Sequence, residues 1–149
     1  ELAHRIRPAG YYNLKARRLK HFVDWLWRCH DGDFDRLEHL PWRQLREALL
    51  GINGIGRETA DAILLYALDK PSFVVDAYTA RVIRRHGLID DEADYEELKS
   101  LFEDHLPDDV ALFNEFHALF VAVGKRHCRP RARCEGCPLA GFDHDEALR

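Results

Sequence analysis

Apolar residues recur at intervals of three and four through most of this 149-residue chain, for example at Leu19, Phe22, Val23, Leu26 and Trp27. This spacing places apolar side chains on one face of an α-helix, and the alternation that is typical of a half-buried strand is nearly absent. The sequence therefore predicts an all-α fold. Turn-forming Gly, Pro and Asp residues separate the expected helices, which span residues 15–30, 42–50, 57–68, 77–87, 94–106 and 109–127.

Length and composition exclude several classes of protein. With 149 residues, 46% of them hydrophobic and 32% charged, the chain matches a globular protein with one main domain. No apolar run approaches the roughly 20 residues that span a bilayer, and the first residues lack the apolar core of a signal peptide. We therefore expect a cytoplasmic protein, nucleoid-associated in a bacterium, with reduced thiols, no membrane contact and no obligate protein partner.

The net charge of −4 argues by itself against a polyanionic partner, but the charge is segregated along the chain. Ten acidic residues and one basic residue lie between Asp90 and Asp109, whereas the segment 125–133 holds five basic residues and no acid. Two further basic groups, at 15–20 and 81–85, recur at helical spacing. They predict a basic face that contacts phosphates, with Lys125 and Arg129 as candidates, although a solvated helix surface has the same pattern.

A glycine-rich turn lies between two helical patterns in the segment 49–60. Glycine lets the backbone approach a ligand closely, and the N–H groups that begin the next helix form an anion site suited to phosphate. Such a turn binds a DNA backbone without reading its sequence. A plain helix-helix turn explains the same glycines, and their spacing disfavours a dinucleotide fold. The candidate DNA-binding residues in and after this hairpin, at 51–57, are Gly51, Ile52, Gly54, Gly56, Arg57 and Thr59.

Asp76 follows the apolar residues 73–75, stands directly before a helical pattern and lies eighteen residues after Glu58. A role as a helix N-cap already explains this residue type at this position. The hairpin 54–60 together with Val75 and Asp76 resembles the hairpin and catalytic aspartate of endonuclease III and its relatives. The resemblance extends from Ala9 to the cysteines near the C-terminus. Within that superfamily, the segments 56–64 and 113–119 are most similar to the endonuclease III-like 3-methyladenine DNA glycosylases.

This resemblance implies a helix-hairpin-helix DNA glycosylase fold over residues 1–127 and an enzyme of base excision repair. Its partner would be double-stranded DNA that contains a damaged base, which is flipped out of the stack. Cleavage of the N-glycosidic bond builds positive charge on the sugar, and the carboxylate of Asp76 would stabilise that charge and orient the attacking water. Glu1 to Gly10 resemble the middle of the family's helical domain, so we expect its early helices to be missing from this sequence.

Glu58 distinguishes between two kinds of glycosylase, although an ordinary exposed helix residue is an equally simple reading. In bifunctional relatives the matching position is a lysine, whose amine forms a Schiff base that leads to strand cleavage, and a carboxylate cannot do this. The residue predicts a monofunctional hydrolase, and the narrower resemblance predicts an alkylated purine as its substrate. The alternatives are a bifunctional glycosylase and AP lyase that acts on oxidised pyrimidines, a noncatalytic DNA-binding helix-hairpin-helix module, and a structural metal-binding protein.

Aromatic side chains could hold a cationic alkylated base by cation–π contact. The candidates by residue type are Tyr11, Tyr12, Trp25, Trp27 and Trp42, although we expect each of them in the core.

Three cysteines lie close together in the segment 128–149, which we expect to form a metal-binding loop and tail. Their spacing, Cys128-x5-Cys134-x2-Cys137, favours a metal site over disulfides in a reducing compartment. The segment resembles the four-cysteine [4Fe-4S] loop of endonuclease III, but the place of the fourth cysteine holds Asp143, followed by His144. Either residue could complete the cluster; zinc, or no metal, is the alternative. We expect the remaining cysteine, Cys29, to be a buried thiol.

Overall fold

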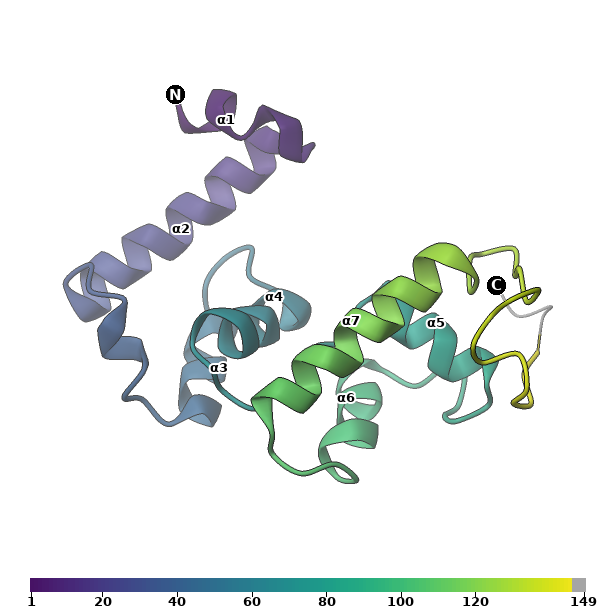
Figure 1. The fold of residues 1–149 in the computed structure, drawn as a ribbon. Coiled ribbons are helices and arrows are strands. Elements are labelled where there is room, and N and C mark those ends of the chain that lie inside the picture. The colour runs from purple at the N-terminus through teal and green to yellow at the C-terminus, as the bar shows by residue number, and fades with distance from the viewer. Residues whose placement is uncertain (146–149) are drawn as a thin grey trace. The chain divides into compact units, whose positions relative to one another are not determined.

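The computed structural model describes residues 1–145, and these residues form helices joined by loops (Figure 1). No strand is present in this part of the chain, so the predicted all-α class is confirmed, and each of the expected helices is present. The α-helices are α1 (Leu2–Arg5), α2 (Tyr12–His30), α3 (Trp42–Leu50), α4 (Arg57–Ala62), α5 (Ala77–Arg85), α6 (Tyr95–Glu103) and α7 (Val110–Arg126). Shorter segments are the 3-10 helices η1 (Arg7–Ala9) and η2 (Asp35–Leu37) and the π-helix η3 (Ile63–Ala67), which directly follows α4.

The chain divides into two compact units, Glu1–Leu64 and the residues from Leu65 onward. The predicted boundary between a helical domain and a cysteine loop at residue 127 stays a prediction. Among residues 1–145, no helix is both long and apolar enough to cross a membrane.

In the first unit, an ion pair fixes the two helices that flank the glycine-rich hairpin. Asp61 of α4 is fully buried, and its carboxylate oxygens accept hydrogen bonds of 2.7 and 3.0 Å from Nε and Nη2 of Arg46 in α3. A bidentate pair of this kind has one preferred geometry. Around it lies an apolar core formed by Leu26, Leu37, Leu45, Leu49, Ile52, Ile55, Ala60 and Leu64.

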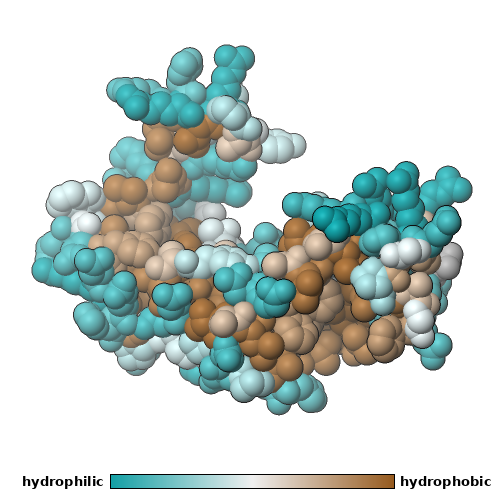
Figure 2. All heavy atoms as spheres, viewed as in Figure 1, coloured by the Kyte–Doolittle hydropathy of each residue, from teal (hydrophilic) through white to brown (hydrophobic). Residues whose placement is uncertain are grey.

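In the second unit, α5 and α7 pack closely against each other. A Cβ atom at Gly124 would lie 2.6 Å from Cβ of Tyr78, so only glycine permits this approach. Beside this pair, the rings of Phe73 and Phe102 stack with centroids 3.9 Å apart, and Phe113 meets Phe73 edge-on at 5.3 Å. Hydrophobic side chains gather over α7 in Figure 2, as expected for a helix whose sequence is apolar on most sides.

Several expectations about burial were wrong. Cys29 is exposed rather than buried, because it lies on the solvent side of α2. Tyr11 and Trp27 are also exposed, with 86% and 65% of their surface accessible. Arg85, which was expected on a basic surface, is only 2% exposed. Periodicity identifies a helix, but it does not say how much of each face other elements cover.

Candidate functional site

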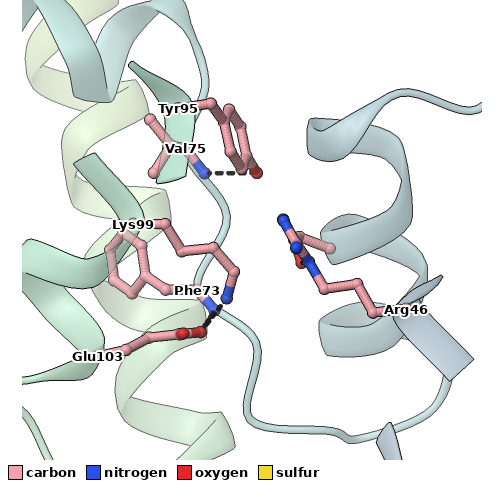
Figure 3. A network of polar contacts seen from close by, with 7 residues as sticks. Arg46, Phe73, Val75, Tyr95, Lys99 and Glu103 are labelled. Atoms are coloured by element: carbon pink, nitrogen blue, oxygen red, sulfur yellow. Dashed lines mark hydrogen bonds and ion pairs between the residues drawn. The ribbon is translucent and has the colours of Figure 1, made fainter. Parts of the chain in front are cut away.

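The segment 72–75 leads into Asp76, and hydrogen bonds from α6 hold it in place. The backbone N–H of Phe73 donates to Oε1 of Glu103 at 2.8 Å, and that of Val75 donates to the hydroxyl of Tyr95 at 3.4 Å (Figure 3). The side chains of this segment are buried. Both ends of α6 therefore fix the backbone immediately before Asp76.

The Glu103 carboxylate that binds Phe73 also forms an ion pair with Lys99, one turn earlier in α6. Lys99 is only 3% exposed, and Figure 3 shows its ammonium group beside Glu103. A buried charge is tolerated when it is paired and hydrogen-bonded. The acidic stretch seen in the sequence is thus not only a solvated surface, because part of it anchors the segment that positions Asp76.

Asp76 is the N-cap of α5, as its residue type predicts. Its Oδ1 accepts hydrogen bonds from the backbone N–H of Thr79 at 2.8 Å and from the Thr79 hydroxyl at 3.0 Å. The other oxygen, Oδ2, lies 3.5 Å from Nε2 of His117 in α7. The carboxylate therefore has one oxygen occupied by its own helix and one directed towards a histidine.

His117 and Tyr66 complete this cluster, which we call the aspartate site: Tyr66, Asp76, Thr79 and His117. The hydroxyl of Tyr66 in η3 hydrogen-bonds to Nδ1 of His117. Sequence reasoning missed both residues. The available signal was a histidine four residues after Phe113 in a mostly apolar helix, because this spacing places two residues on one face.

The electrostatics of the site favour an ionised Asp76. Burial raises the pKa of its carboxyl. Hydrogen bonds from His117 and Thr79, together with the charge of His117, lower this pKa by more than burial raises it, so it lies below the usual value. The pKa of the Tyr66 hydroxyl is raised by burial and by the negative charge of Asp76. At neutral pH the site thus contains a carboxylate and a neutral phenol.

The predicted hairpin is present in the first unit, between α3 and α4. Gly51 follows α3, Gly54 has the left-handed φ of +95°, and Gly56 is the N-cap of α4. A Cβ atom at Gly54 would lie 2.4 Å from Cγ of Arg18, so this position requires glycine for its backbone and for space. The turn is held to α2 because Nδ1 of His21 hydrogen-bonds to the carbonyl of Asn53 at 2.8 Å.

The hairpin exposes the residues that could meet a phosphate, with one exception. Arg57, Glu58 and Thr59 are exposed in the first turn of α4, as expected for Glu58 on a helix surface. The side chain of Ile52 is only 6% exposed, so this residue could contact DNA only through its backbone. The amide N–H groups in the first turn of a helix have no partners within that helix and attract anions.

A cleft of about 730 Å³ lies beside the hairpin in the same unit. Trp25 and Trp27 line it, which places two of the aromatic candidates beside the hairpin rather than in the core. The other lining residues are His21, Asp24, Arg28, Gly51, Ile52 and Asn53.

The basic residues of the second unit divide into two sets. Lys125 and Arg129 are exposed, and Nε of Arg129 donates to the carbonyl of Lys125 at 2.8 Å. Arg81 and Arg85 instead bind the cysteine loop, which we define as residues 128–145. Arg81 donates to the carbonyl of Cys128 at 2.7 Å, and Arg85 donates to Sγ of Cys128 at 3.0 Å and to the carbonyl of Arg129 at 2.9 Å.

The three predicted metal-ligating cysteines line one small cavity of about 20 Å³. His144 lines the same cavity, whereas Asp143 is exposed and does not. Among residues 1–145, no group of three or more His, Cys, Asp or Glu side chains lies in a geometry that could hold a metal ion. The structure thus brings the sulfurs to one cavity without converging them on one point.

The chain matches a known protein family. Residues 1–108 match the family model described as HhH-GPD superfamily base excision DNA repair protein. The chain is 48% identical to the protein of Methanocaldococcus jannaschii named "Putative DNA repair glycosylase MJ1434", over 92% of this chain and 63% of that protein. It is 30% identical to endonuclease III of Sulfolobus acidocaldarius, over 92% of this chain and 59% of that protein. It therefore spans about three fifths of the length of these relatives.

Solved structures agree with these matches. A non-covalent complex of endonuclease III with DNA has a TM-score of 0.76 and 25% identity, over 95% of this chain and 62% of that chain. The H. pylori 3-methyladenine DNA glycosylase bound to 1,N6-ethenoadenine has a TM-score of 0.70 and 32% identity, over 83% of this chain and 61% of that chain. The predicted helix-hairpin-helix fold and the predicted resemblance are confirmed.

Proposed function

Because the chain belongs to the HhH-GPD superfamily of base excision DNA repair proteins, we propose that it hydrolyses the N-glycosidic bond of a damaged nucleotide in double-stranded DNA. The observation that carries this proposal is the Asp76 carboxylate, which lies at the N-terminus of α5 with its pKa held below the usual value. A fixed negative charge of this kind stabilises the positive charge that develops on the sugar as the bond breaks.

In this mechanism the damaged nucleotide leaves the stack, which costs least for a base that pairs poorly. Oδ1 of Asp76 stays bound to Thr79, so the carboxylate keeps its orientation while the sugar becomes cationic. Oδ2 then faces the sugar carbon or the attacking water. Because this charge is preorganised, the site does not have to rearrange as the transition state forms.

We propose that the enzyme is monofunctional, because Glu58 occupies the hairpin position where lyase relatives have a lysine. A carboxylate cannot form the iminium that strand cleavage requires. The substrate is an alkylated purine, a cationic base that leaves without strong acid catalysis. The observation that supports this choice is the similarity to the H. pylori 3-methyladenine DNA glycosylase.

DNA would be held mainly through its backbone. The candidate contacts are the hairpin glycines with the start of α4, where Arg57 and Thr59 are exposed, and the exposed Lys125 and Arg129. Contacts to phosphates position a protein on the duplex and carry no sequence information, which suits an enzyme that must find damage in any sequence. They also make the affinity fall with salt.

For the cysteine loop we propose a [4Fe-4S] cluster held by Cys128, Cys134 and Cys137, with His144 as the fourth ligand. His144 lines the cavity with the cysteines, and its Nδ1 hydrogen-bonds to the carbonyl of Phe142 at 2.7 Å. A ligating histidine commonly donates its other ring N–H to a carbonyl in this way, which directs Nε2 to the metal. Bound there, the cluster would order the loop that carries Arg129. Residues 146–149 of the proposed tail, which begins at 128, lie outside the described residues.

The test is excision from alkylated double-stranded DNA, measured with and without subsequent alkali. We expect release of a free base and an intact abasic strand that breaks only on alkali treatment. Strand breaks without alkali, together with a covalent adduct that borohydride traps at a yield matching base release, would instead show a bifunctional enzyme. DNA binding that weakens with salt but is accompanied by no base release would show a noncatalytic module.

A further inference from the structure

We propose that His117, held by Tyr66, is a positioning residue that orients Oδ2 of Asp76 and stabilises the charged carboxylate. This inference rests on the proposed glycosylase function and extends it to two residues outside the hairpin and aspartate motif. It assigns a role to a histidine from α7 and a tyrosine from η3, which the fold brings to the N-terminus of α5.

The first argument is the geometry of the histidine ring. Its side chain is 16% exposed and that of Asp76 is 15% exposed, so both groups are largely removed from water. Nδ1 binds the Tyr66 hydroxyl, and Nε2 lies 3.5 Å from Oδ2 of Asp76. Nε2 is buried, and no closer hydrogen-bond partner for it exists among residues 1–145. A buried imidazole nitrogen that faces a carboxylate and nothing else has only that carboxylate to bind.

The second argument concerns which nitrogen carries the proton. In the neutral ring only one nitrogen is protonated, and the hydrogen bond at the other sets which one. When the Tyr66 hydroxyl donates to Nδ1, the proton lies on Nε2, the nitrogen 3.5 Å from Oδ2. When the ring is protonated, Nε2 carries a proton as well. Both forms stabilise the carboxylate, and burial together with the charge of Asp76 raises the pKa of Tyr66, so the phenol stays neutral.

The third argument is that the two oxygens of Asp76 are held from different elements. Thr79 of α5 occupies Oδ1, while His117 of α7 faces Oδ2. The ionisable groups that face the carboxylate are therefore His117 and Tyr66. In the first turn of α5, the ring of Tyr78 has Arg81 of α5 and Lys125 of α7 over it, with their cations 5.4 and 6.0 Å from its centroid. His117 is therefore the contact to the carboxylate from outside α5 that a substitution can remove selectively.

The experiment compares three substitutions of His117 by the pH dependence of single-turnover base excision. His117→Gln keeps an amide N–H near the position of Nε2, His117→Asn keeps one near Nδ1 only, and His117→Leu keeps neither. Without the donor, the carboxyl of Asp76 gains a proton at higher pH. We therefore expect the pH below which the excision rate falls, the acid limb of the pH–rate profile, to rise by about one unit in the Leu and Asn variants. His117→Gln should restore the limb, with the enzyme concentration that gives half of the maximal rate unchanged in all three.

A direct titration separates this inference from the proposed function. The Asp76 carboxyl is followed by NMR in the same folded proteins without DNA, and thermal unfolding reports on their stability. A raised pKa in the Asn and Leu variants, with rescue by Gln, supports the positioning role even if the wild-type chain releases no base. An unchanged Asp76 titration across the three variants overturns it, whatever the excision rates. If His117→Leu fails to fold, the Gln and Asn pair makes the same comparison.

Discussion

The aspartate site and the cysteine loop lie in the same unit, but they are held in different ways. Asp76 is fixed by Thr79 of its own helix and faces His117 of α7, and the segment before it is bound by α6. The cysteine loop buries Cys128 but leaves Cys134 and Cys137 half-exposed, and its main anchors are the guanidinium groups of Arg81 and Arg85.

This difference shows what holds the geometry of each region. In the aspartate site, side chains of the protein itself hold the carboxylate, because Thr79 binds one oxygen and His117 faces the other. The cysteine loop has the ligand types, but its thiols do not converge in the structure. A metal supplies folding energy to a segment of this kind, which has little apolar core of its own. We therefore expect the two regions to respond independently to substitution.

The largest expected effect comes from Asp76→Asn, which breaks the aspartate site alone. The amide still caps α5 but carries no charge, so excision should fall by about 10³-fold. Salt-dependent DNA binding and the metal content of the loop should remain. The matched control is Asp109→Asn, since Asp109 is also an N-cap, of α7, and accepts a hydrogen bond from Leu112 N. Comparable turnover by Asp76→Asn and its control would show that Asp76 has no catalytic role.

A second substitution tests whether α6 supports the aspartate site from outside it. Lys99→Met leaves the Glu103 carboxylate without its buried cation and should lower the free energy of unfolding by about 3 kcal/mol. Lys20→Met is the control, because the Lys20–Asp24 pair has the same spacing but an exposed ammonium group. Its effect should stay below about 0.5 kcal/mol. Equal effects in chemical denaturation would show that burial of the Lys99 pair has no role in stability.

Two substitutions in the cysteine loop test which residue is the fourth metal ligand and whether a change there leaves the aspartate site unaffected. His144→Ala should lower the affinity for the metal by at least about 10- to 100-fold, the loss that removal of an outer-shell partner already causes, while Asp143→Ala should leave it unchanged. Iron, zinc and acid-labile sulfide are measured in the purified proteins, together with the NMR titration of Asp76, which should not move. Zinc in place of iron and sulfide would identify the alternative centre. Loss of metal in Asp143→Ala instead of His144→Ala would reassign the ligand.

The smallest expected effect concerns the hairpin, which belongs to neither region. Arg57→Ala should weaken binding to all duplex sequences alike and reduce the salt dependence by about one phosphate contact. Arg36→Ala, which removes one exposed cation from outside the predicted basic face, serves as the control. The measurement is the slope of log K against log salt for two unrelated duplexes. A change in sequence preference would contradict the phosphate role.

Most of the helices could be predicted because their signals are local. The expected starts of α3, α4 and α5 at residues 42, 57 and 77 match the structure, since a turn or capping residue precedes each helix. The capping role of Asp76 could be predicted for the same reason, whereas its proposed catalytic role came from the resemblance to endonuclease III and not from local spacing. The exposure of Cys29 and Trp27 could not be predicted, because it depends on what covers each face of α2.

The amino-acid sequence by itself determined the all-α class, the hairpin, the capping aspartate and the set of thiols, since each depends on neighbours a few residues apart. Only the tertiary structure decided which groups surround them. Tyr66 and His117 are 51 residues apart, Arg85 and Cys128 are 43 apart, and Phe73 and Glu103 are 30 apart. Contacts over such separations arise from the packing of helices, and no local pattern of residue types encodes which side chains that packing brings together.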